Sequence, residues 1–213
     1  MSAAWKDDQP PRLAVADVAS EEDDVIEERE AFLDAMSRAA TGVTVVASDG
    51  ELGRRGQTVS AICSVSADPP SLLVCLNRKS QLVPAIEAHG VFGVSVLRAD
   101  QKRIADSFAG RPASHDKPYD FDRVRWETAV TGSPLLVSAV AKFDCRLLEA
   151  HTIGTHTIYI GAVVASSAAK GKPLVYASRG YGELFAFPRP RTTPFTVADI
   201  DPRIPVDLGE FYT

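Results

Sequence analysis

The sequence predicts a mainly β fold, a largely antiparallel barrel with helices at its periphery. Six or seven stretches have the apolar or β-branched character of strands, and three short segments between them have helical spacing. Strands and helices do not alternate strictly, which argues against a doubly wound parallel sheet. No internal repeat of about 20–50 residues is visible, so a solenoid or propeller is not expected.

The composition is that of an ordinary globular protein: 45% of the 213 residues are apolar and 24% are charged. No apolar run approaches the ~20 residues that a membrane-spanning helix needs, and the N-terminus lacks the pattern of a secretory signal. The formal net charge of −5 is concentrated in residues 1–30, which hold ten acidic and three basic side chains. The nearly neutral remainder offers no nucleic-acid surface. We therefore expect a cytoplasmic protein that binds neither membranes nor nucleic acid.

Three segments are expected along the chain. Residues 1–24 are acidic, punctuated by proline and without periodicity, which predicts a disordered N-terminal tail. Residues 25–184 hold all the predicted strands and helices and are expected to form one domain. Residues 185–213 are rich in proline, which predicts a C-terminal extension that packs on the domain or on a partner subunit.

The domain is expected to open with a helix followed by a strand. Apolar residues at helical spacing predict a helix over 25–40, which Thr41-Gly42 would end. The valine-rich stretch 43–48 predicts a strand, and Asp49-Gly50 indicates a turn after it.

The stretch 57–67, QTVSAICSVSA, is predicted as one strand with two unlike faces. At a period of two residues, one face carries hydroxyl groups and the other carries small apolar side chains that are expected in a core. The hydroxyl face is either plain solvent exposure or a surface for a polar ligand. It comprises Thr58, Ser60, Ile62, Ser64 and Ser66, and the apolar face comprises Val59, Ala61, Cys63, Val65 and Ala67.

The rest of the domain is predicted as apolar strands separated by short helices and loops. Ser80 is placed to cap one helix and Asp100 another, and Trp126 is expected to anchor the loop 111–134 in the body of the protein. The predicted strands are 71–76, 91–97, 138–150, 156–166 and 174–177, and the predicted helices are 81–89 and one that ends near 108–110.

Cysteine and histidine usage gives no signal for a metal or a disulfide. The three cysteines, Cys63, Cys75 and Cys145, are odd in number and form no C-x-x-C pair, so they are predicted to be buried structural residues. His89 ends a predicted helix, where a charged ring would meet the helix dipole. His156, judged by spacing alone, is typical of a histidine within a strand. No metal site is expected.

Residues 77–80, Asn-Arg-Lys-Ser, combine an amide, two cations, a hydroxyl group and the start of a predicted helix. This combination favours a phosphate site, and a simple capped turn is the alternative. The sequence has no G-x-G-x-x-G, P-loop, H-E-x-x-H or G-x-S-x-G motif. A nicotinamide cofactor would therefore have to bind without a Rossmann domain.

Taken together, several stretches resemble the flavin reductase family, which supplies reduced flavin to two-component monooxygenases. They run in family order over residues 29–184. The resemblance implies an FMN-binding split β-barrel, usually a homodimer with the flavin near the subunit interface, with FMN or FAD as the flavin and NADH or NADPH as the hydride donor. The matching stretches are TGVTVV at 41–46, QTVSAICSVSADPPSLLVCLNRKS at 57–80, GVFGVSVL at 90–97, RIADSFAG at 103–110, HTIYIGAV at 156–163 and PLVYASRGYG at 173–182.

The resemblance also implies a set of site residues. It makes His156 the catalytic residue, in the sense of a group that orients the nicotinamide or steadies charge on the reduced flavin. The implied cofactor-binding residues are Gln57, Thr58, Ser60 and Ala61 along the isoalloxazine ring; Cys75, Leu76 and Asn77 on the adjoining strand; Lys79 and Ser80 in the phosphate-binding turn; Ser107 and Phe108 over the flavin; Gly154, Thr155 and Thr157 beside the nicotinamide nucleotide; and Arg179 and Tyr181 at the pocket rim.

The implied function is that of an NAD(P)H:flavin oxidoreductase. Hydride would pass from nicotinamide C4 to flavin N5, and reduced flavin would diffuse to a partner monooxygenase. One alternative is a specialised flavoenzyme on the same barrel that holds its flavin tightly, with the extension 185–213 covering the pocket. Another is a non-enzymatic flavin- or haem-binding protein, because a fold does not determine an activity. The choice of flavin, of nicotinamide nucleotide and of partner stays open at this point.

Overall fold

The computed structural model describes residues 22–113 and 115–185 of the chain. The polypeptide divides into the units Met1–Glu183 and Leu184–Thr213, and all the described helices and strands belong to the first unit. The predicted acidic tail up to residue 21 and the predicted extension from residue 186 onward lie outside the described residues. No described helix is long and apolar enough to cross a bilayer.

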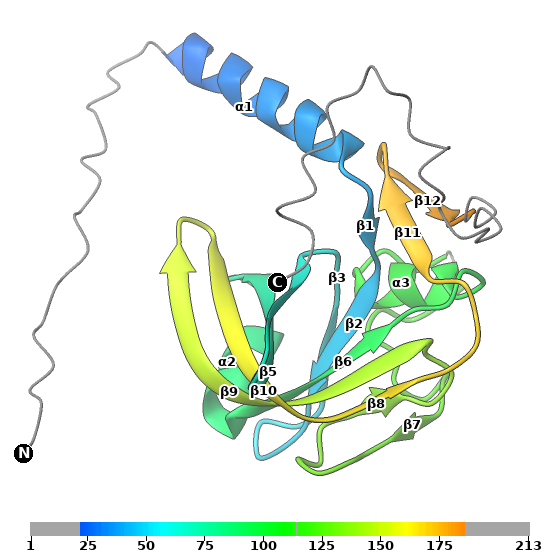
Figure 1. Cartoon of the computed structure of the whole chain (residues 1–213). Coiled ribbons are helices and arrows are strands. Elements are labelled where there is room, and N and C mark those ends of the chain that lie inside the picture. Colours follow the sequence, from blue (N-terminus) through cyan, green and yellow to red (C-terminus); the bar gives the residue numbers. More distant parts are fainter. Residues whose placement is uncertain (1–21, 114, 186–213) are drawn as a thin grey trace, which may run out of the picture. The chain divides into compact units, whose positions relative to one another are not determined.

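A seven-stranded antiparallel sheet forms the centre of the first unit (Figure 1). Its two longest strands, β9 and β10, form a hairpin of 13-residue strands in its middle. The predicted mainly antiparallel fold is confirmed. In spatial order the strands are β3 (Arg55–Val59), β2 (Thr44–Ser48), β6 (Val91–Val96), β9 (Ala141–Ile153), β10 (His156–Ala168), β5 (Pro70–Asn77) and β4 (Ile62–Ala67).

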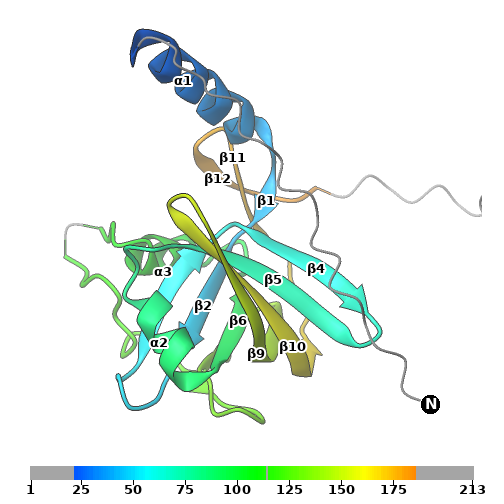
Figure 2. The ribbon, with the colours of Figure 1, turned by 90° about the vertical axis from the view of Figure 1, so that its left-hand side faces the viewer.

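The two edge strands of this sheet, β3 and β4, are consecutive in the chain. Only Ser60 and Ala61 separate them, so these two residues cross from one edge of the curled sheet to the other (Figure 2). The Ala61 carbonyl accepts a hydrogen bond from the Cys75 N–H at 3.1 Å, which joins the crossing to β5. The single strand predicted over 57–67 is therefore wrong, because the chain there belongs to two strands with different neighbours.

The crossing also shifts the alternation of the side chains. Val59 before it is buried, and Ile62 after it packs against the core, so two inward positions lie three residues apart instead of two. The prediction that Cys63 and Val65 lie in the core is consequently wrong. Cys63 is exposed, and Val65 keeps 48% of its surface accessible.

Two hydrophobic clusters pack against the sheet, and β2 separates them. Val46 belongs to the first cluster and Val45 to the second, because neighbouring residues of a strand face opposite sides. All five residues of β2 are buried, which explains its continuous apolar character. The first cluster includes residues of α2 (Leu82–His89), and the second includes residues of α3 (Lys102–Phe108), β8 (Leu135–Leu136) and β11 (Leu174–Ala177).

Smaller elements surround this core. Helix α1 spans Glu22–Arg38, and the short β1 (Thr41–Gly42) pairs with β11, which pairs in turn with β12 (Gly180–Glu183). The predicted role of Trp126 is confirmed, because Trp126 in β7 (Trp126–Glu127) packs against the second cluster and its Nε1–H donates to the Phe121 carbonyl at 3.0 Å. The large apolar residues Ile26, Phe32, Leu33 and Met36 of α1 are exposed rather than packed.

His89 is the last residue of α2, as predicted, and its ring contacts two neighbouring segments. Its Nε2 accepts the Leu52 N–H at 3.2 Å. Its Nδ1 lies 2.9 Å from the Ser48 hydroxyl, which donates to the Val91 carbonyl. The ring thus ties α2 to the turn between β2 and β3.

Gly93 in the centre of the sheet gives a test of this packing. A Cβ atom there would lie 2.6 Å from the Pro134 carbonyl oxygen and 2.8 Å from a Leu135 methyl group. We expect Gly93→Ala to lower the free energy of unfolding by about 1–3 kcal/mol, measured by urea denaturation. Gly182→Ala is the matched control, because a Cβ at Gly182 would meet no atom within 4 Å. Equal stability of the two variants would contradict the close approach described here.

Candidate functional site

Two hollows meet at the turn between β5 and α2. The first hollow has a volume of about 430 Å³ and lies between the start of β3, this turn and the loop that carries Tyr119 and Phe121. The second hollow, of about 860 Å³, lies between the same turn, α1 and the turn of the β9–β10 hairpin. Asn77 and Lys79 line both. The first is completed by Arg54, Arg55, Gly56, Gln57, Ser80, Gln81 and Leu82, and the second by Arg29, Phe32, Leu33, Arg78, Gly154, Thr155 and His156.

The shared turn is held by its own hydrogen bonds. The Asn77 side-chain oxygen accepts the Lys79 N–H, and the Asn77 carbonyl accepts the Ser80 N–H, both at 2.9 Å. The Arg78 N–H donates to the Thr155 carbonyl at 3.0 Å, which fastens the turn to the β9–β10 hairpin. These bonds set the position from which the Lys79 ammonium group is presented to both hollows.

Ser80 joins the turn to β3 and to α2. Its hydroxyl donates to the Gln57 side-chain oxygen at 2.9 Å and accepts the Leu82 N–H at 3.2 Å. The helix-capping residue is Gln81, one position after the predicted cap, and its side chain makes no capping bond. The Ser80 hydroxyl performs that role instead, and the same contact fixes Gln57 at the edge of the first hollow.

The first hollow is strongly positive. Three of its lining residues, Arg54, Arg55 and Lys79, are cations, and none is an aspartate or glutamate. Arg54 is partly neutralised by Asp49, 3.0 Å away, whereas Arg55 and Lys79 have no ion pair with any described carboxylate. A hollow of this kind favours an anionic ligand. The adjacent arginines at its rim were not singled out from the sequence, although their position directly before Gly56 and a strand was a usable signal.

His156 lies at the edge of the second hollow. It is paired with Asn77 across the β5–β10 ladder, and its Nδ1 lies 2.9 Å from the Thr155 hydroxyl. The ring is exposed, so Nε2 can exchange a hydrogen bond with a ligand. Gly154, with a φ of +55°, forms the hairpin turn beside it. The structure thus brings His156, Gly154 and Thr155 together with the turn at Lys79.

Other predicted site residues line neither hollow. The Thr58 hydroxyl donates to the Ala105 carbonyl at 2.7 Å, and the buried Thr157 hydroxyl lies 3.3 Å from that of Thr152. Leu76 is in the first core cluster, and Cys75 beside it is half-buried, which raises the pKa of its thiol. Ser60 and Ala61 are exposed at the crossing between β3 and β4.

The two predicted rim residues lie on the β11–β12 hairpin. Arg179 is exposed in the hairpin turn with a φ of +61°. Tyr181 packs against Tyr176 with ring centroids 5.3 Å apart, and burial together with the nearby Asp106 raises its pKa to about 12. Neither residue lines either hollow.

Ser107 and Phe108 act on the first hollow through a loop. The Ser107 hydroxyl donates to the Lys117 carbonyl at 3.0 Å and accepts the Asp120 N–H at 3.4 Å. The Phe108 ring meets Phe121 edge to face, with centroids 4.9 Å apart. Both contacts hold the segment that carries the aromatic wall of the hollow.

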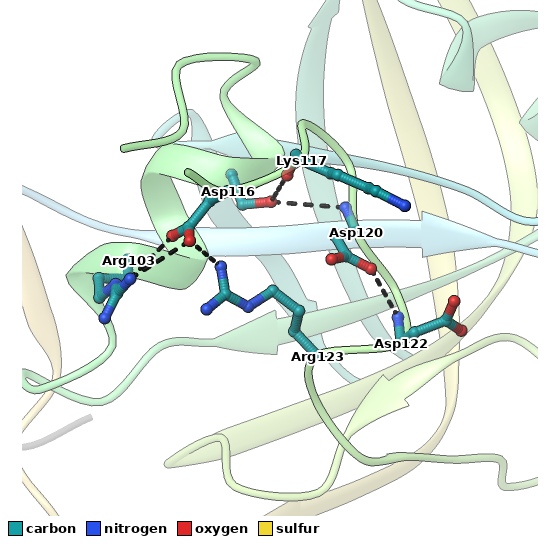
Figure 3. Close-up of polar contacts among 7 residues, drawn as sticks. Arg103, Asp116, Lys117, Asp120, Asp122 and Arg123 are labelled. Carbon is teal, nitrogen blue, oxygen red and sulfur yellow. Dashed lines mark hydrogen bonds and ion pairs between the residues drawn. The ribbon is translucent and has the colours of Figure 1, made fainter. Parts of the chain in front are cut away.

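An arginine-bound carboxylate fastens the same loop to α3. Asp116 makes ion pairs with Arg123 and with Arg103, the second at 3.2 Å (Figure 3). Only 6% of the Asp116 side chain is accessible. The hydrogen bond from Arg123, aided by Arg103, lowers the pKa of Asp116 below its usual value. The two arginines therefore favour the ionised form of this carboxylate.

Within the described residues, no three histidine, cysteine, aspartate or glutamate side chains gather where they could hold a metal ion. The site consists of cations, hydroxyls, amides and one histidine. Such a set binds and orients an anionic ligand and leaves redox chemistry to bound molecules.

Comparisons with known proteins agree on one family. Residues 36–184 match the family described as flavin reductase like domain. The FMN reductase (NADH) RutF of Ancylobacter novellus is 42% identical over 154 residues, which cover 72% of this chain and 83% of that protein.

Solved structures give the same result. The flavin reductase component BorF of a bacterial two-component tryptophan halogenase superposes with a TM-score of 0.66 at 35% identity, covering 73% of this chain and 98% of that one. The NADH:FAD oxidoreductase SgcE6 of Streptomyces globisporus, in complex with NAD and FAD fragments, has a TM-score of 0.67 at 30% identity, with 75% and 94% covered.

Replacing Asp116 tests the attachment of the loop. In Asp116→Asn both ion pairs are lost, so we expect faster amide hydrogen exchange in peptides covering 111–125 and unchanged exchange in β9. Asp34→Asn, which removes an exposed ion pair on α1, is the control. Unchanged exchange of the loop in Asp116→Asn would show that other contacts hold it.

The protection of the same loop from hydrogen exchange should decrease in acid. Because the pKa of Asp116 is lower in the folded protein, its stabilising contribution is complete above the ordinary aspartate value of about 3.9 and is lost only as the pH falls through the folded value. We expect constant loop protection, after correction for intrinsic exchange, from pH 8 to 5, with a loss below about pH 4. A loss that begins near pH 6 would contradict this assignment.

Proposed function

Because the chain belongs to the family of flavin reductase like domains, we propose that it is an NADH-dependent flavin reductase that reduces FMN. The observation that carries the proposal is the junction of two hollows at Asn77 and Lys79, one lined by cations and the other by His156. Hydride transfer needs two ligands in direct contact, and two hollows that share one turn can hold them so.

The residues present fit a flavin phosphate in the first hollow. Lys79 supplies a charge without a carboxylate partner, and the N-terminal turn of α2 follows directly after Ser80. In this proposal Gln57 and the exposed Ser60-Ala61 crossing lie along the flavin ring, while Ser107 and Phe108 hold the loop that covers it. Thr58, Cys75, Leu76 and Thr157 then support the site from within the fold rather than touch the ligand.

The second hollow fits the nicotinamide nucleotide. Its cations Arg29, Arg78 and Lys79 can meet the two phosphates of NADH, and Gly154 leaves room beside His156. His156 is proposed to orient the nicotinamide amide through Nε2. Its contact with Thr155 restricts rotation of the ring and so reduces the entropy lost on binding.

The reaction requires little acid–base machinery from the protein. The bound nicotinamide gives a hydride from C4 to flavin N5, and one further proton from water completes the two-electron reduction. The protein's part is to hold both ligands in contact and to place hydrogen-bond donors and cations where negative charge develops. Lys79 is suited to stabilising that negative charge because it lines both hollows.

We further propose a cytoplasmic homodimer that also accepts FAD and delivers reduced flavin to a monooxygenase. Exposed apolar residues support the dimer: Phe32 and Met36 on α1, Leu148 and Ile153 on the β9–β10 hairpin, and Val65 on β4. The halogenase component BorF and other structural relatives support the transfer of flavin to a second component. Residues 25–184 are proposed to be the catalytic domain.

The first test is anaerobic mixing of the purified protein with NADH and FMN. We expect loss of NADH absorbance and stoichiometric bleaching of added FMN over many turnovers. Absence of NADH oxidation with FMN, FAD and riboflavin would overturn the proposal. One equivalent of flavin that stays bound and blocks further turnover would favour the specialised flavoenzyme.

Two substitutions test the proposed roles of Lys79 and His156. Lys79→Gln removes a charge-assisted contact, so we expect about tenfold weaker binding of FMN and no change for riboflavin, which lacks the phosphate. His156→Asn should raise the KM for NADH without changing FMN affinity. Lys170→Gln, at an exposed lysine away from both hollows, is the control. Weaker riboflavin binding in Lys79→Gln would show that Lys79 does not act through a phosphate.

A further inference from the structure

Arg55 is the cation in the first hollow that a single flavin phosphate at the Lys79 turn leaves without a partner. Its side chain is half-buried, and Nη1 donates to the Arg54 carbonyl at 2.9 Å. A guanidinium group has five N–H donors in a planar fork, so most of them stay available. No described carboxylate lies within ion-pair distance of Arg55, in contrast to Arg54 with Asp49.

The backbone holds Arg55 in place. Gly56, the next residue, is buried, and a Cβ atom there would lie 2.9 Å from the Phe121 ring and 3.0 Å from the Phe108 ring. The strand therefore packs directly on the two aromatic rings, and it presents the Arg55 side chain to the hollow from a fixed position.

Arg55 lies two residues before Gln57 in β3, and Gln57 contacts the proposed phosphate-binding turn. In β3 the side chains of Arg55 and Gln57 leave the same face, with their Cα atoms about 7 Å apart, and Gln57 contacts Ser80. A phosphate held by Lys79 and the start of α2, as proposed above, would occupy the Gln57 end. The Arg55 end can then receive a second phosphate attached to the first.

The first hollow also has an aromatic wall. Tyr119 and Phe121 line the first hollow, and the Arg54 guanidinium lies 5.5 Å from the centroid of the Phe121 ring. A hollow of about 430 Å³ is of the size that accommodates a small organic molecule rather than a phosphate alone. A second phosphate followed by a flat heterocycle is the chemistry of an adenosine diphosphate group.

We propose that Arg55 recognises the second phosphate of a dinucleotide flavin and that the wall of Tyr119 and Phe121 receives its adenine. Arg55 is then the residue that sets the affinity for FAD relative to FMN. This inference rests on the proposed flavin reductase function and deepens it, since it names the residue by which the same site distinguishes the two flavins.

The test compares three oxidised flavins that share one ring: riboflavin, FMN and FAD. Equilibrium binding to the full-length protein is measured by fluorescence or calorimetry, without NADH. We expect Arg55→Gln to weaken FAD binding about tenfold, to change FMN binding less than about twofold, and to leave riboflavin binding unchanged. Arg55→Lys should restore part of the FAD affinity, because it keeps the charge and loses the planar fork.

Arg125→Gln is the matched control, since Arg125 is exposed and lines neither hollow. It tests whether loss of one positive charge anywhere weakens FAD. Equal weakening of FMN and FAD in Arg55→Gln would overturn the inference, because Arg55 would then touch only the phosphate that both flavins carry. An unchanged FAD affinity would overturn it as well.

Failure of the inference about Arg55 can be distinguished from failure of the proposed reductase function. A protein that binds and reduces FMN with NADH but keeps its ratio of FAD to FMN affinity in Arg55→Gln retains the proposed function and loses only this inference. A protein that oxidises no NADH with any flavin loses the proposed function. Flavin binding to that protein would still report on Arg55.

Discussion

One main-chain hydrogen bond, from the Arg78 N–H to the Thr155 carbonyl, unites the two halves of the candidate site. It continues the β5–β10 ladder past the last pair, Asn77 and His156, into the turn that carries Lys79. The β5–β10 ladder alone would fix Asn77 and His156 but leave the following turn freer to move relative to the hairpin. Because of this hydrogen bond, a cation and a histidine from distant parts of the chain face adjoining hollows. A reaction that depends on contact between two ligands is especially sensitive to that kind of constraint.

The clustering of cations lowers the stability of the fold, and an anionic ligand can offset this effect. Arg54, Arg55 and Lys79 line one hollow without an acidic residue among its walls, so their mutual repulsion opposes folding in the absence of an anion. The surrounding structure tolerates this because each group keeps access to water, and Asp49 neutralises one of them. An anionic ligand that binds only the folded state would stabilise the protein by mass action. Ligand affinity and stability are therefore coupled at this site.

Local patterns in the sequence predicted most strands, because a strand such as β2 must be apolar along its whole length when both of its faces are buried. The local patterns failed at Ser60-Ala61. There the period-two alternation continues in the sequence, while the chain passes from β3, which pairs with β2, to β4, which pairs with β5. Nothing in the local residue types marks a crossing between sheet edges, since that event is determined by which strands curl together. The apolar face of α1 shows the same limit. Its spacing predicted a helix correctly, but spacing alone does not state what the face packs against.

The residues of the candidate site also fall into two groups, those that local sequence patterns could predict and those that they could not. Asn77, Lys79 and His156 could be recognised from the sequence because they belong to contiguous motifs that the fold preserves. The contributions of Arg55, Tyr119 and Phe121 could not, since they depend on the loop that Ser107, Phe108 and Asp116 hold against β3. Motif residues can contact what related proteins bind in common, whereas residues brought in by a loop contact the part of the ligand that differs. For that reason we expect the residues on the wall of the first hollow, rather than those of the turn at Lys79, to determine which flavin is preferred.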